Sequence, residues 1–334
     1  MKPLAEMLKF GPVTKLGKAG VLGMNSRNLD SISSYNPRRF YPLVDDKVIT
    51  KKLAIEAGVT VPELYGVIRY GGEMHIIEEV AQKHRSFVVK PANGSGGGGI
   101  MVFNGVAKTG LRRMNGQIMA WSDVKYHLNN MLSGMFSMGD GSDEVMIEER
   151  LVPHSAFSKL AFGGVPDVRV IVFRGVPVMA MLRLPTAESD GKANLHQGGI
   201  GAGIDLETGI TTRGVQHNES VEQHPDFETP VRDFQVPSWP DILELASRLG
   251  HHVGLGYVGV DIVICEHKGP TLLELNARPG IAIQTANLRG LRPLLLPVHK
   301  LPSIPEDVHE RLEIAIANWK GEPLDRFIAP GEQH

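Results

Sequence analysis

The segment 257–280, YVGVDIVICEHKGPTLLELNARPG, constrains the fold of this chain more than any other feature. Two apolar runs flank a polar break at residues 267–270. Apolar runs bounded by Gly and Pro are typical of paired strands, so the segment predicts a β-hairpin. Because side chains alternate between the two faces of a strand, we expect Glu274 and Asn276 on one face and the leucines beside them on the other.

The same hairpin predicts a metal site. A turn centred between Lys268 and Gly269 would set Asp261 opposite Asn276 and one diagonal step from Glu274. Directly opposed side chains have Cβ atoms about 4.5–5.5 Å apart, and diagonal ones about 7–8 Å. Three oxygen ligands at this spacing suit a hard cation such as Mg²⁺. The alternative is a hairpin with a hydrated polar face, because short motifs also occur without function.

The composition is that of a globular protein, with 334 residues, 42% hydrophobic and 22% charged. This length suits a core divided over two or three subdomains. The net charge of −2 gives no general attraction to nucleic acid or to anionic membranes, so we predict no nucleic-acid partner. The single cysteine, Cys265, is consistent with a reducing compartment. Neither a signal peptide nor a membrane span is evident, and we predict a soluble cytoplasmic protein.

Helix and strand patterns predict an α+β fold, because antiparallel hairpins are mixed with helices. The glycine-rich segment 192–203 is expected to be a loop. The expected strands are 59–68, 85–91, 100–103 and 143–153, with a hairpin at 167–185 that turns at Arg174-Gly175, and the expected helices are 44–58, 73–84, 121–136, 238–254 and 308–321.

A glycine-rich loop follows Lys90 in the sequence KPANGSGGGGI, residues 90–100. It is not a Walker A loop, because the lysine precedes the glycines and the chain returns as a strand. Glycines allow backbone N–H groups to approach phosphates, and the lysine supplies a positive charge. We predict a phosphate-binding loop. The alternative is an ordinary glycine-rich turn, for which four consecutive glycines would be costly in chain entropy.

Six motifs in order make the chain resemble the ATP-grasp superfamily, and within it the RimK-type alpha-L-glutamate ligases and the sugar-transfer-associated ATP-grasp proteins. The resemblance runs from about residue 45 to about residue 291. It implies a fold in which a nucleotide is held between two α+β subdomains with a glycine-rich lid. The motifs are DDKxxTKxLAxxAGVxVP at 45–62, FVVKPANGSGGGGI at 87–100, VMIEERL at 145–151, DVRV at 167–170, NLHQGG at 194–199, and VDIV…LLELNARPG at 260–280.

The resemblance also implies a division of the chain. Residues 45–150 would form the N-terminal part of the ATP-grasp fold with its lid, and residues 151–334 the C-terminal part with the metal and substrate sites. Residues 1–44 would replace the larger domain that usually precedes this fold. Their role, and that of His196, stays open at this point.

Individual residues receive roles from the same resemblance. Lys47 and Lys90 would contact ATP phosphates, Arg169 would face the transferred phosphoryl group, and Arg278 would border the carboxylate substrate. One or two Mg²⁺ ions, or Mn²⁺, would occupy the metal site. Further nucleotide contacts would come from Ser95, Gly96, Gly97 and Gly98 of the lid, from Glu148, Glu149, Arg150 and Leu151 of a hinge strand beside adenine, and from Asp167 and Asn194.

The expected function is that of an ADP-forming ligase that joins a carboxylate to an amine through an acyl phosphate, as the glutamate, amino-acid and peptide ligases of this superfamily do. Its partners would be a carboxylate substrate and an amine acceptor, each a small molecule or a peptide, and a homo-oligomer is compatible with the sequence. The alternatives are a kinase on the same fold and a nucleotide-binding protein without catalysis.

Overall fold

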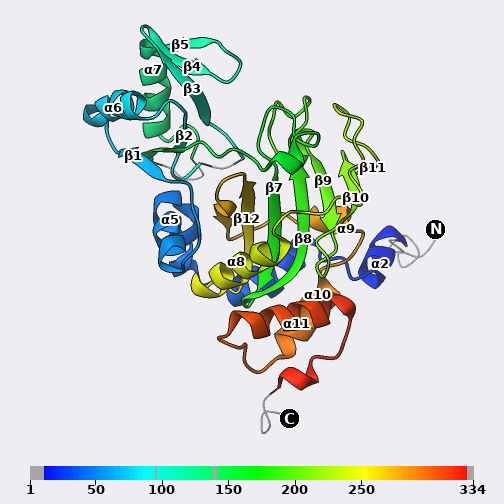
Figure 1. Ribbon diagram of the computed structural model, residues 1–334. Helices are drawn as coiled ribbons and strands as arrows, with labels where there is room; N and C mark the ends of the chain where they lie inside the picture. Colours follow the sequence, from blue (N-terminus) through cyan, green and yellow to red (C-terminus); the bar gives the residue numbers. More distant parts are fainter. Residues whose placement is uncertain (1–10, 95, 138–140, 329–334) are drawn as a thin grey trace, which may run out of the picture. The chain divides into compact units, whose positions relative to one another are not determined.

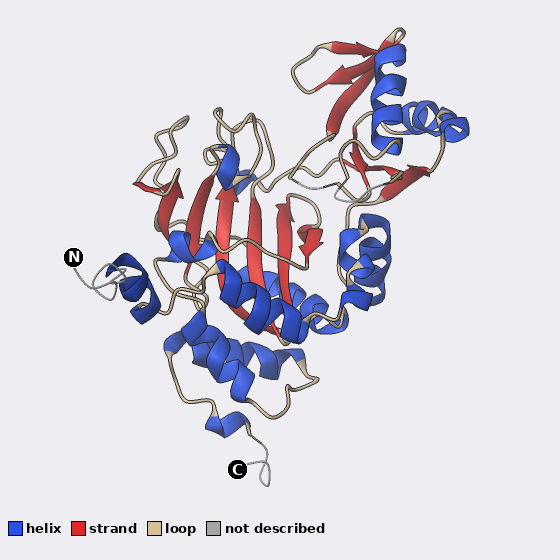
Figure 2. Ribbon diagram, turned by 180° about the vertical axis from the view of Figure 1, so that it is seen from behind, coloured by secondary structure: helices blue, strands red, loops and turns tan. Residues whose placement is uncertain are grey.

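The computed structural model of the chain describes residues 11–94, 96–137 and 141–328. These residues form two compact units, each with one antiparallel sheet and helices packed against it (Figures 1 and 2), so the predicted α+β class is confirmed. The small unit consists of Pro42–Val152 and Thr271–Leu273, and the large unit consists of the described parts of Met1–Tyr41, Pro153–Pro270 and Glu274–His334.

The small unit contains a six-stranded antiparallel sheet with the strand order β1-β6-β2-β3-β4-β5. Helices α6 (His75–Lys83) and α7 (Trp121–Leu132) pack against it, and their apolar side chains share one core with the sheet. The strands are β1 (Leu64–Ile68), β2 (Phe87–Pro91), β3 (Met101–Ala107), β4 (Gly110–Arg113), β5 (Ile118–Ala120) and β6 (Val145–Glu149).

Helix α5 (Lys47–Glu56) is capped at its N-terminus by Asp46. The carboxylate of Asp46 accepts hydrogen bonds from the backbone N–H groups of Val48 and Ile49 at 2.8 and 3.1 Å. Such a cap satisfies donors that the first helical turn leaves unpaired. A short helix, α4 (Pro42–Asp45), precedes the cap, so the predicted helix 44–58 is divided at Asp46.

The large unit contains a seven-stranded sheet with the order β11-β10-β9-β8-β7-β12-β13. Its central strands are buried except at Arg169 of β7 and Arg183 of β8, which explains their nearly continuous apolar sequences. The strands are β7 (Asp167–Phe173), β8 (Val176–Leu184), β9 (Ile200–Ile204), β10 (Thr211–Gln216), β11 (Glu219–Val221), β12 (Tyr257–Cys265) and β13 (Gly269–Asn276).

Helices cover both faces of this sheet. Helix α8 (Trp239–His252) packs on β7, β8 and β12, and α11 (Val308–Lys320) packs on β8 and on α8 (Figure 1). Helix α9 (Ile283–Asn287) contacts β8, β9 and β10. In the sheet register, Gly203 beneath α9 pairs with Met181, and Met181 pairs with Arg169. Because directly paired residues share a face, α9 lies on the face that carries Arg169.

The N-terminal segment is tied to the start of β12. It contains α2 (Gly11–Lys18), α3 (Met24–Ser26), the π-helix η1 (Arg27–Ser33) and the 3-10 helix η2 (Arg38–Phe40). The buried amide of Asn36 accepts a hydrogen bond from the backbone N–H of Tyr257 at 2.9 Å and donates to the Tyr257 carbonyl at 2.7 Å. It also donates to the carbonyl of Ala277 at 3.0 Å. The Asn36 side chain therefore makes backbone hydrogen bonds of the kind that a neighbouring strand would make.

The expected loop at 192–203 is wrong in its second half, because residues 200–204 form the fully buried strand β9. Its glycines permit a close approach of other elements. A Cβ atom on Gly203 would lie 2.6 Å from the carbonyl oxygen of Ala286, and one on Gly201 would lie 2.7 Å from a methyl carbon of Leu195. Glycine inside a strand often marks such a close approach rather than a loop.

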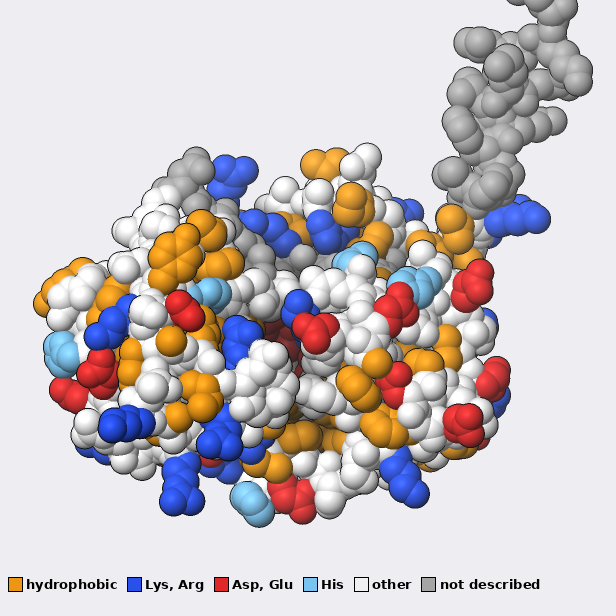
Figure 3. Space-filling model, turned by 90° about the horizontal axis from the view of Figure 1, so that it is seen from above, with side chains coloured by type: hydrophobic (Ala, Val, Ile, Leu, Met, Phe, Trp, Pro, Cys, Tyr) orange, Lys and Arg blue, Asp and Glu red, His pale blue; other side chains and the backbone are white. Residues whose placement is uncertain are grey.

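The remaining elements are α10 (Arg292–Lys300), η3 (Gly71–Glu73), η4 (Ser155–Phe157), η5 (Leu195–Gln197) and η6 (Asp325–Phe327). None of the described helices combines the length and the apolar character needed to cross a bilayer. On the face shown in Figure 3, acidic and basic side chains are interspersed between separate groups of hydrophobic side chains.

Candidate active site

Strands β7, β8 and β12 bring four charged side chains together in the large unit. The sheet register pairs Asp167 with Arg183 and Arg169 with Asp261. The Arg169 guanidinium donates to both oxygens of Asp261, from Nε to Oδ1 at 2.7 Å and from the terminal nitrogen to Oδ2 at 2.5 Å. Arg183 bridges the two carboxylates, with Nε 2.5 Å from Asp167 and a terminal nitrogen 2.8 Å from Asp261.

This cluster is buried, and its charges depend on one another. Burial raises the pKa of Asp261, but the neighbouring Arg169 and Arg183 outweigh it, together with a hydrogen bond from Glu274, and hold that pKa well below its usual range. For Asp167, burial and the nearby Asp261 charge outweigh the attraction of Arg183 and raise its pKa to about 7. The arginines are thus fixed by Asp261, which stays ionised at neutral pH.

The hairpin of β12 and β13 differs from the predicted one in its turn. The turn occupies residues 266–268 and β13 begins at Gly269, so the predicted centre between Lys268 and Gly269 is wrong. The side chain that hydrogen-bonds with Asp261 is that of Glu274. Asn276 accepts a hydrogen bond from the backbone N–H of Arg278 at 2.9 Å. Glu274 and Asn276 are both half-buried.

The predicted metal ligands are of the type that fits a hard cation, although two arginines already bind the carboxylate oxygens of Asp261. A carboxylate offers about four lone-pair positions; Arg169 and Arg183 use three and the hydrogen bond with Glu274 uses the fourth, so a cation would replace that bond. Glu274 and the amide oxygen of Asn276 would supply the other protein ligands, which suits an ion that retains water and phosphate oxygens. Among the described residues, no group of three or more His, Cys, Asp and Glu side chains could hold a metal ion by itself.

The small unit contains a second buried charge cluster, around Glu148. Lys90 lies 2.5 Å from Oε1 of Glu148, and Lys51 lies 2.8 Å from Oε2. Burial raises the pKa of Glu148, but the charges of Lys90 and Lys51 outweigh it and lower that pKa, so the carboxylate is ionised. Both Glu148 oxygens therefore position lysines. The sequence analysis predicted Glu148 beside adenine and did not suggest these contacts with lysines.

The glycine loop is fastened at both ends. The Lys47 ammonium donates to the carbonyls of Ala92, at 3.4 Å, and of Gly94. At the far end, His127 Nε2 lies 2.9 Å from the carbonyl of Gly99. Gly96, Gly97 and Gly99 have positive φ, a backbone conformation that residues with a side chain rarely adopt. Ser95 lies outside the described residues.

The base of the loop is held by Asp143, a buried residue that the sequence analysis missed. Its carboxylate accepts hydrogen bonds from the Asn93 backbone at 3.1 Å, from the Asn93 amide at 2.8 Å, from the Glu144 backbone at 2.7 Å and from the Ser137 hydroxyl. These donors tie the start of the loop at Asn93 to the segment that leads into β6.

Residues 149 and 150 of the predicted hinge strand, and Asn194, make hydrogen bonds within the protein. Glu149 accepts from the backbone N–H of Glu63 at 3.0 Å, and Arg150 donates to the Ser86 hydroxyl at 2.7 Å. Asn194 caps η5 through a bond of 3.0 Å from the backbone N–H of the exposed His196. Leu151 is buried, whereas Gly98 contributes only backbone to the loop.

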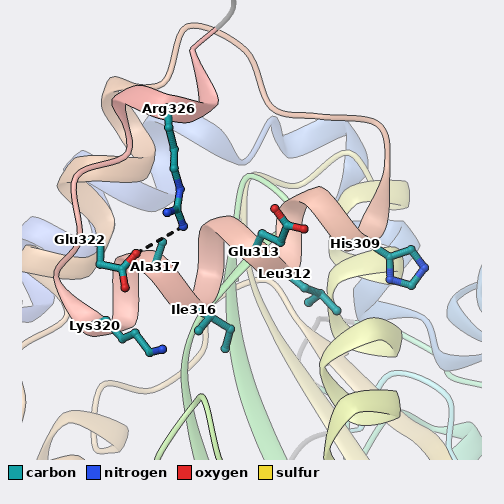
Figure 4. A pocket seen from close by; sticks show the side chains of 8 residues that line it. All are labelled: His309, Leu312, Glu313, Ile316, Ala317, Lys320, Glu322 and Arg326. Carbon is teal, nitrogen blue, oxygen red and sulfur yellow. Dashed lines mark ion pairs between the residues drawn. The ribbon is translucent and has the colours of Figure 1, made fainter.

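The sequence analysis also missed Arg183 and Lys51. Arg183 lies at an alternate position of an apolar strand, and Lys51 lies one helical turn after Lys47, so strand and helix periodicity could have placed both near the predicted residues. A separate pocket of about 490 Å³ lies along α11, where Arg326 and Glu322 form an ion pair at its edge (Figure 4). None of the predicted site residues lines it.

Comparison with solved structures finds similar folds at low identity. D-cycloserine synthetase DcsG is 15% identical over 85% of this chain and 73% of its own, with a TM-score of 0.43. A complex of the ATP-grasp ligase PsnB with a precursor variant, Mg and ADP is 15% identical over 85% of this chain and 62% of its own, with a TM-score of 0.42. D-alanine–D-alanine ligase from Bacillus anthracis is 15% identical over 84% and 68%, with a TM-score of 0.42.

No curated protein sequence matches the chain. The family model described as sugar-transfer associated ATP-grasp matches residues 26–300, which is most of the sequence. The match includes the strands that carry Lys90, Glu148, Arg169 and Asp261. The chain therefore belongs to the sugar-transfer associated ATP-grasp family.

Proposed function

We propose that this protein is an ATP-dependent ligase that joins a carboxylate to an amine and releases ADP and phosphate. The observation that supports this most directly is a set of positive charges held in place by buried carboxylates. Lys90 is fixed by Glu148, and Arg169 is fixed by Asp261. Transfer of a phosphoryl group depends on positioning and charge neutralisation more than on covalent help from the protein.

The proposed reaction has two steps. A carboxylate oxygen attacks the γ-phosphorus of ATP, the bond to the bridging β–γ oxygen breaks, and ADP leaves with that electron pair. The amine then attacks the carbonyl carbon of the acyl phosphate. The C–O bond to phosphate breaks, the nitrogen loses a proton, and an amide and inorganic phosphate remain. Neither step needs a protein nucleophile.

Each group of residues has a role in this proposal. Lys47 and Lys90 bind phosphate oxygens, Arg169 contacts the transferred phosphoryl group, and Arg278 orients the carboxylate substrate. Asp261, Glu274 and Asn276 would hold Mg²⁺, which neutralises phosphate charge when bound. Gly96, Gly97, Gly98 and Ser95 would cover the phosphates, Glu148 to Leu151 would lie beside adenine, and Asp167 and Asn194 would support the phosphate contacts. The cytoplasm, which supplies ATP, is the expected compartment.

A screen for ADP release tests the proposal. We expect release only when ATP, Mg²⁺, a carboxylate and an amine are all present, and hydroxylamine in place of the amine should yield a hydroxamate. Glu274→Ala should abolish turnover, while Glu244→Ala, at a half-buried glutamate of α8 that pairs with Arg248, should leave it unchanged. ADP release that requires an alcohol and yields no hydroxamate would instead identify a kinase.

A further inference from the structure

The hydroxyl of Tyr257 is buried without a hydrogen-bond partner. Tyr257 begins β12 and is 0% exposed. Among the described residues its hydroxyl is the one buried side-chain oxygen or nitrogen that makes no hydrogen bond. Burying a hydroxyl without a hydrogen-bond partner is unfavourable, and phenylalanine would fill the same space without that cost. The hydroxyl therefore indicates a partner other than the described residues themselves.

The position of Tyr257 connects this hydroxyl with the candidate active site. Tyr257, Gly259 and Asp261 alternate along β12, so all three point to the sheet face that carries Arg169. Pro279 crosses this face, because a Cβ atom on Gly259 would lie 2.8 Å from the Cβ atom of Pro279. The unpaired hydroxyl thus belongs to the same face as the phosphoryl-transfer residues, beside the segment that follows Asn276.

Arg27 of the N-terminal segment lies at the same place. It donates one hydrogen bond to the carbonyl of Pro279 at 2.9 Å and two to the side chain of Asn28, at 3.1 and 2.8 Å. Burial outweighs the opposing positive charge of Arg27 and raises the pKa of the Tyr257 hydroxyl to about 12. A guanidinium has five N–H donors, so two remain without a partner among the described residues.

A second arginine and the local charge favour an anion here. Arg278 directly precedes Pro279, is exposed, and stacks over Tyr41 at 4.8 Å from the ring centroid. The exposed Arg38 and Arg39 belong to the same N-terminal segment. Although the whole chain carries a net charge of −2, this part of the large unit presents several guanidinium groups, and Asp30 of the same segment lies 4.0 Å from Arg292.

We propose that Arg27, Tyr257 and Arg278 form a subsite for a second oxyanion of the substrate, a carboxylate or a phosphate group separate from the carboxylate that is activated. This inference rests on the proposed function and names its substrate class: an acidic molecule with two anionic groups. Arg27 and Arg278 attract the anion. The Tyr257 hydroxyl is buried in the free chain. It donates to an anion oxygen when the Arg27 side chain moves to bind the ligand.

Binding measured without ATP separates this subsite from catalysis. Isothermal titration of the whole protein with glutarate, with inorganic phosphate, and with uncharged glutaramide uses defined probes. We expect glutarate or phosphate to bind and glutaramide not to bind, and the tighter of the two anions identifies the group. Tyr257→Phe and Arg27→Gln should each weaken binding at least about tenfold, because each removes a hydrogen bond to a charged group.

Two further measurements make the result decisive. Arg248→Gln on α8 removes an exposed arginine from a helix on the other face of the sheet and should leave anion binding unchanged. Tyr257→Phe should unfold at the same temperature as the wild type or higher, because it removes an unpaired buried hydroxyl. Absence of anion binding to the wild type, wild-type binding by Tyr257→Phe, or equal weakening by Arg248→Gln would each overturn the subsite. Anion binding without ligase turnover would leave the subsite standing and refute the proposed function.

Discussion

Replacing Arg183 by methionine should destabilise the large unit strongly. The Arg183 side chain is 12% exposed, and those of Asp167 and Asp261 are 4% and 0% exposed. Removing one partner of a buried ion pair costs about 3–5 kcal/mol, whereas an exposed pair contributes about 0.2–1 kcal/mol. Asp261 retains Arg169, so the loss falls mainly on Asp167, and we expect the free energy of unfolding to fall by about 3–4 kcal/mol.

Urea unfolding at pH 7.5 without Mg²⁺ measures this loss. Trp121 lies in the small unit, and Trp239 and Trp319 in the large one, so a Trp121→Phe background makes the fluorescence report the large unit. Arg248→Met, which breaks an exposed pair on α8, should cost under about 1 kcal/mol. Adding Asp167→Asn to Arg183→Met should restore part of the stability, because a neutral amide needs no cation. A loss below about 1 kcal/mol in Arg183→Met would refute the assignment of a buried pair.

Three further changes test other parts of the fold. Gly203→Ala should destabilise by about 1–3 kcal/mol in the same unfolding assay, while Gly23→Ala, whose Cβ has open space, should be nearly neutral. Burial lowers the pKa of His224, so the folded state takes up fewer protons than the unfolded chain as the pH falls. The contribution of His224 to stability should be full above about pH 6.5 and should decrease below it. His224→Gln should remove this part of the pH dependence of unfolding between about pH 7.5 and 5. Asp143→Ala should speed hydrogen exchange in peptides covering residues 90–100 and raise the KM for ATP, and unchanged exchange would contradict its role as the loop anchor.

The sequence predicted the turn of the hairpin formed by β7 and β8 but not the pairing of its charged residues. A hairpin turning at Arg174-Gly175 pairs Phe173 with Val176 and, without interruption, would set Asp167 opposite Leu182. The structure has an irregularity between Ile171 and Val172 that shifts the register by one residue and sets Asp167 opposite Arg183. A β-bulge of this kind has no distinctive sequence here, so the bridging arginine could not be identified from the pattern.

The glycines likewise show which features the local sequence could predict and which it could not. Those following Lys90 were correctly interpreted as a loop, because several take positive φ there. Those at 201 and 203 belong to a buried strand, because α9 packs close to the backbone. Both uses depend on the absence of a side chain, and only the position of a distant helix distinguishes them. Local sequence could not supply that position.

The bonds between Asn36 and Tyr257 join residues 221 positions apart, and this separation affects the order of folding during synthesis. At about 5–20 residues per second, the ribosome needs about 11–44 s after Asn36 to add Tyr257. During that interval the stretch Pro42–Val152, which supplies all six strands of the small unit, has already been completed. The N-terminal segment is thus made well before β12 but docks only once β12 has formed.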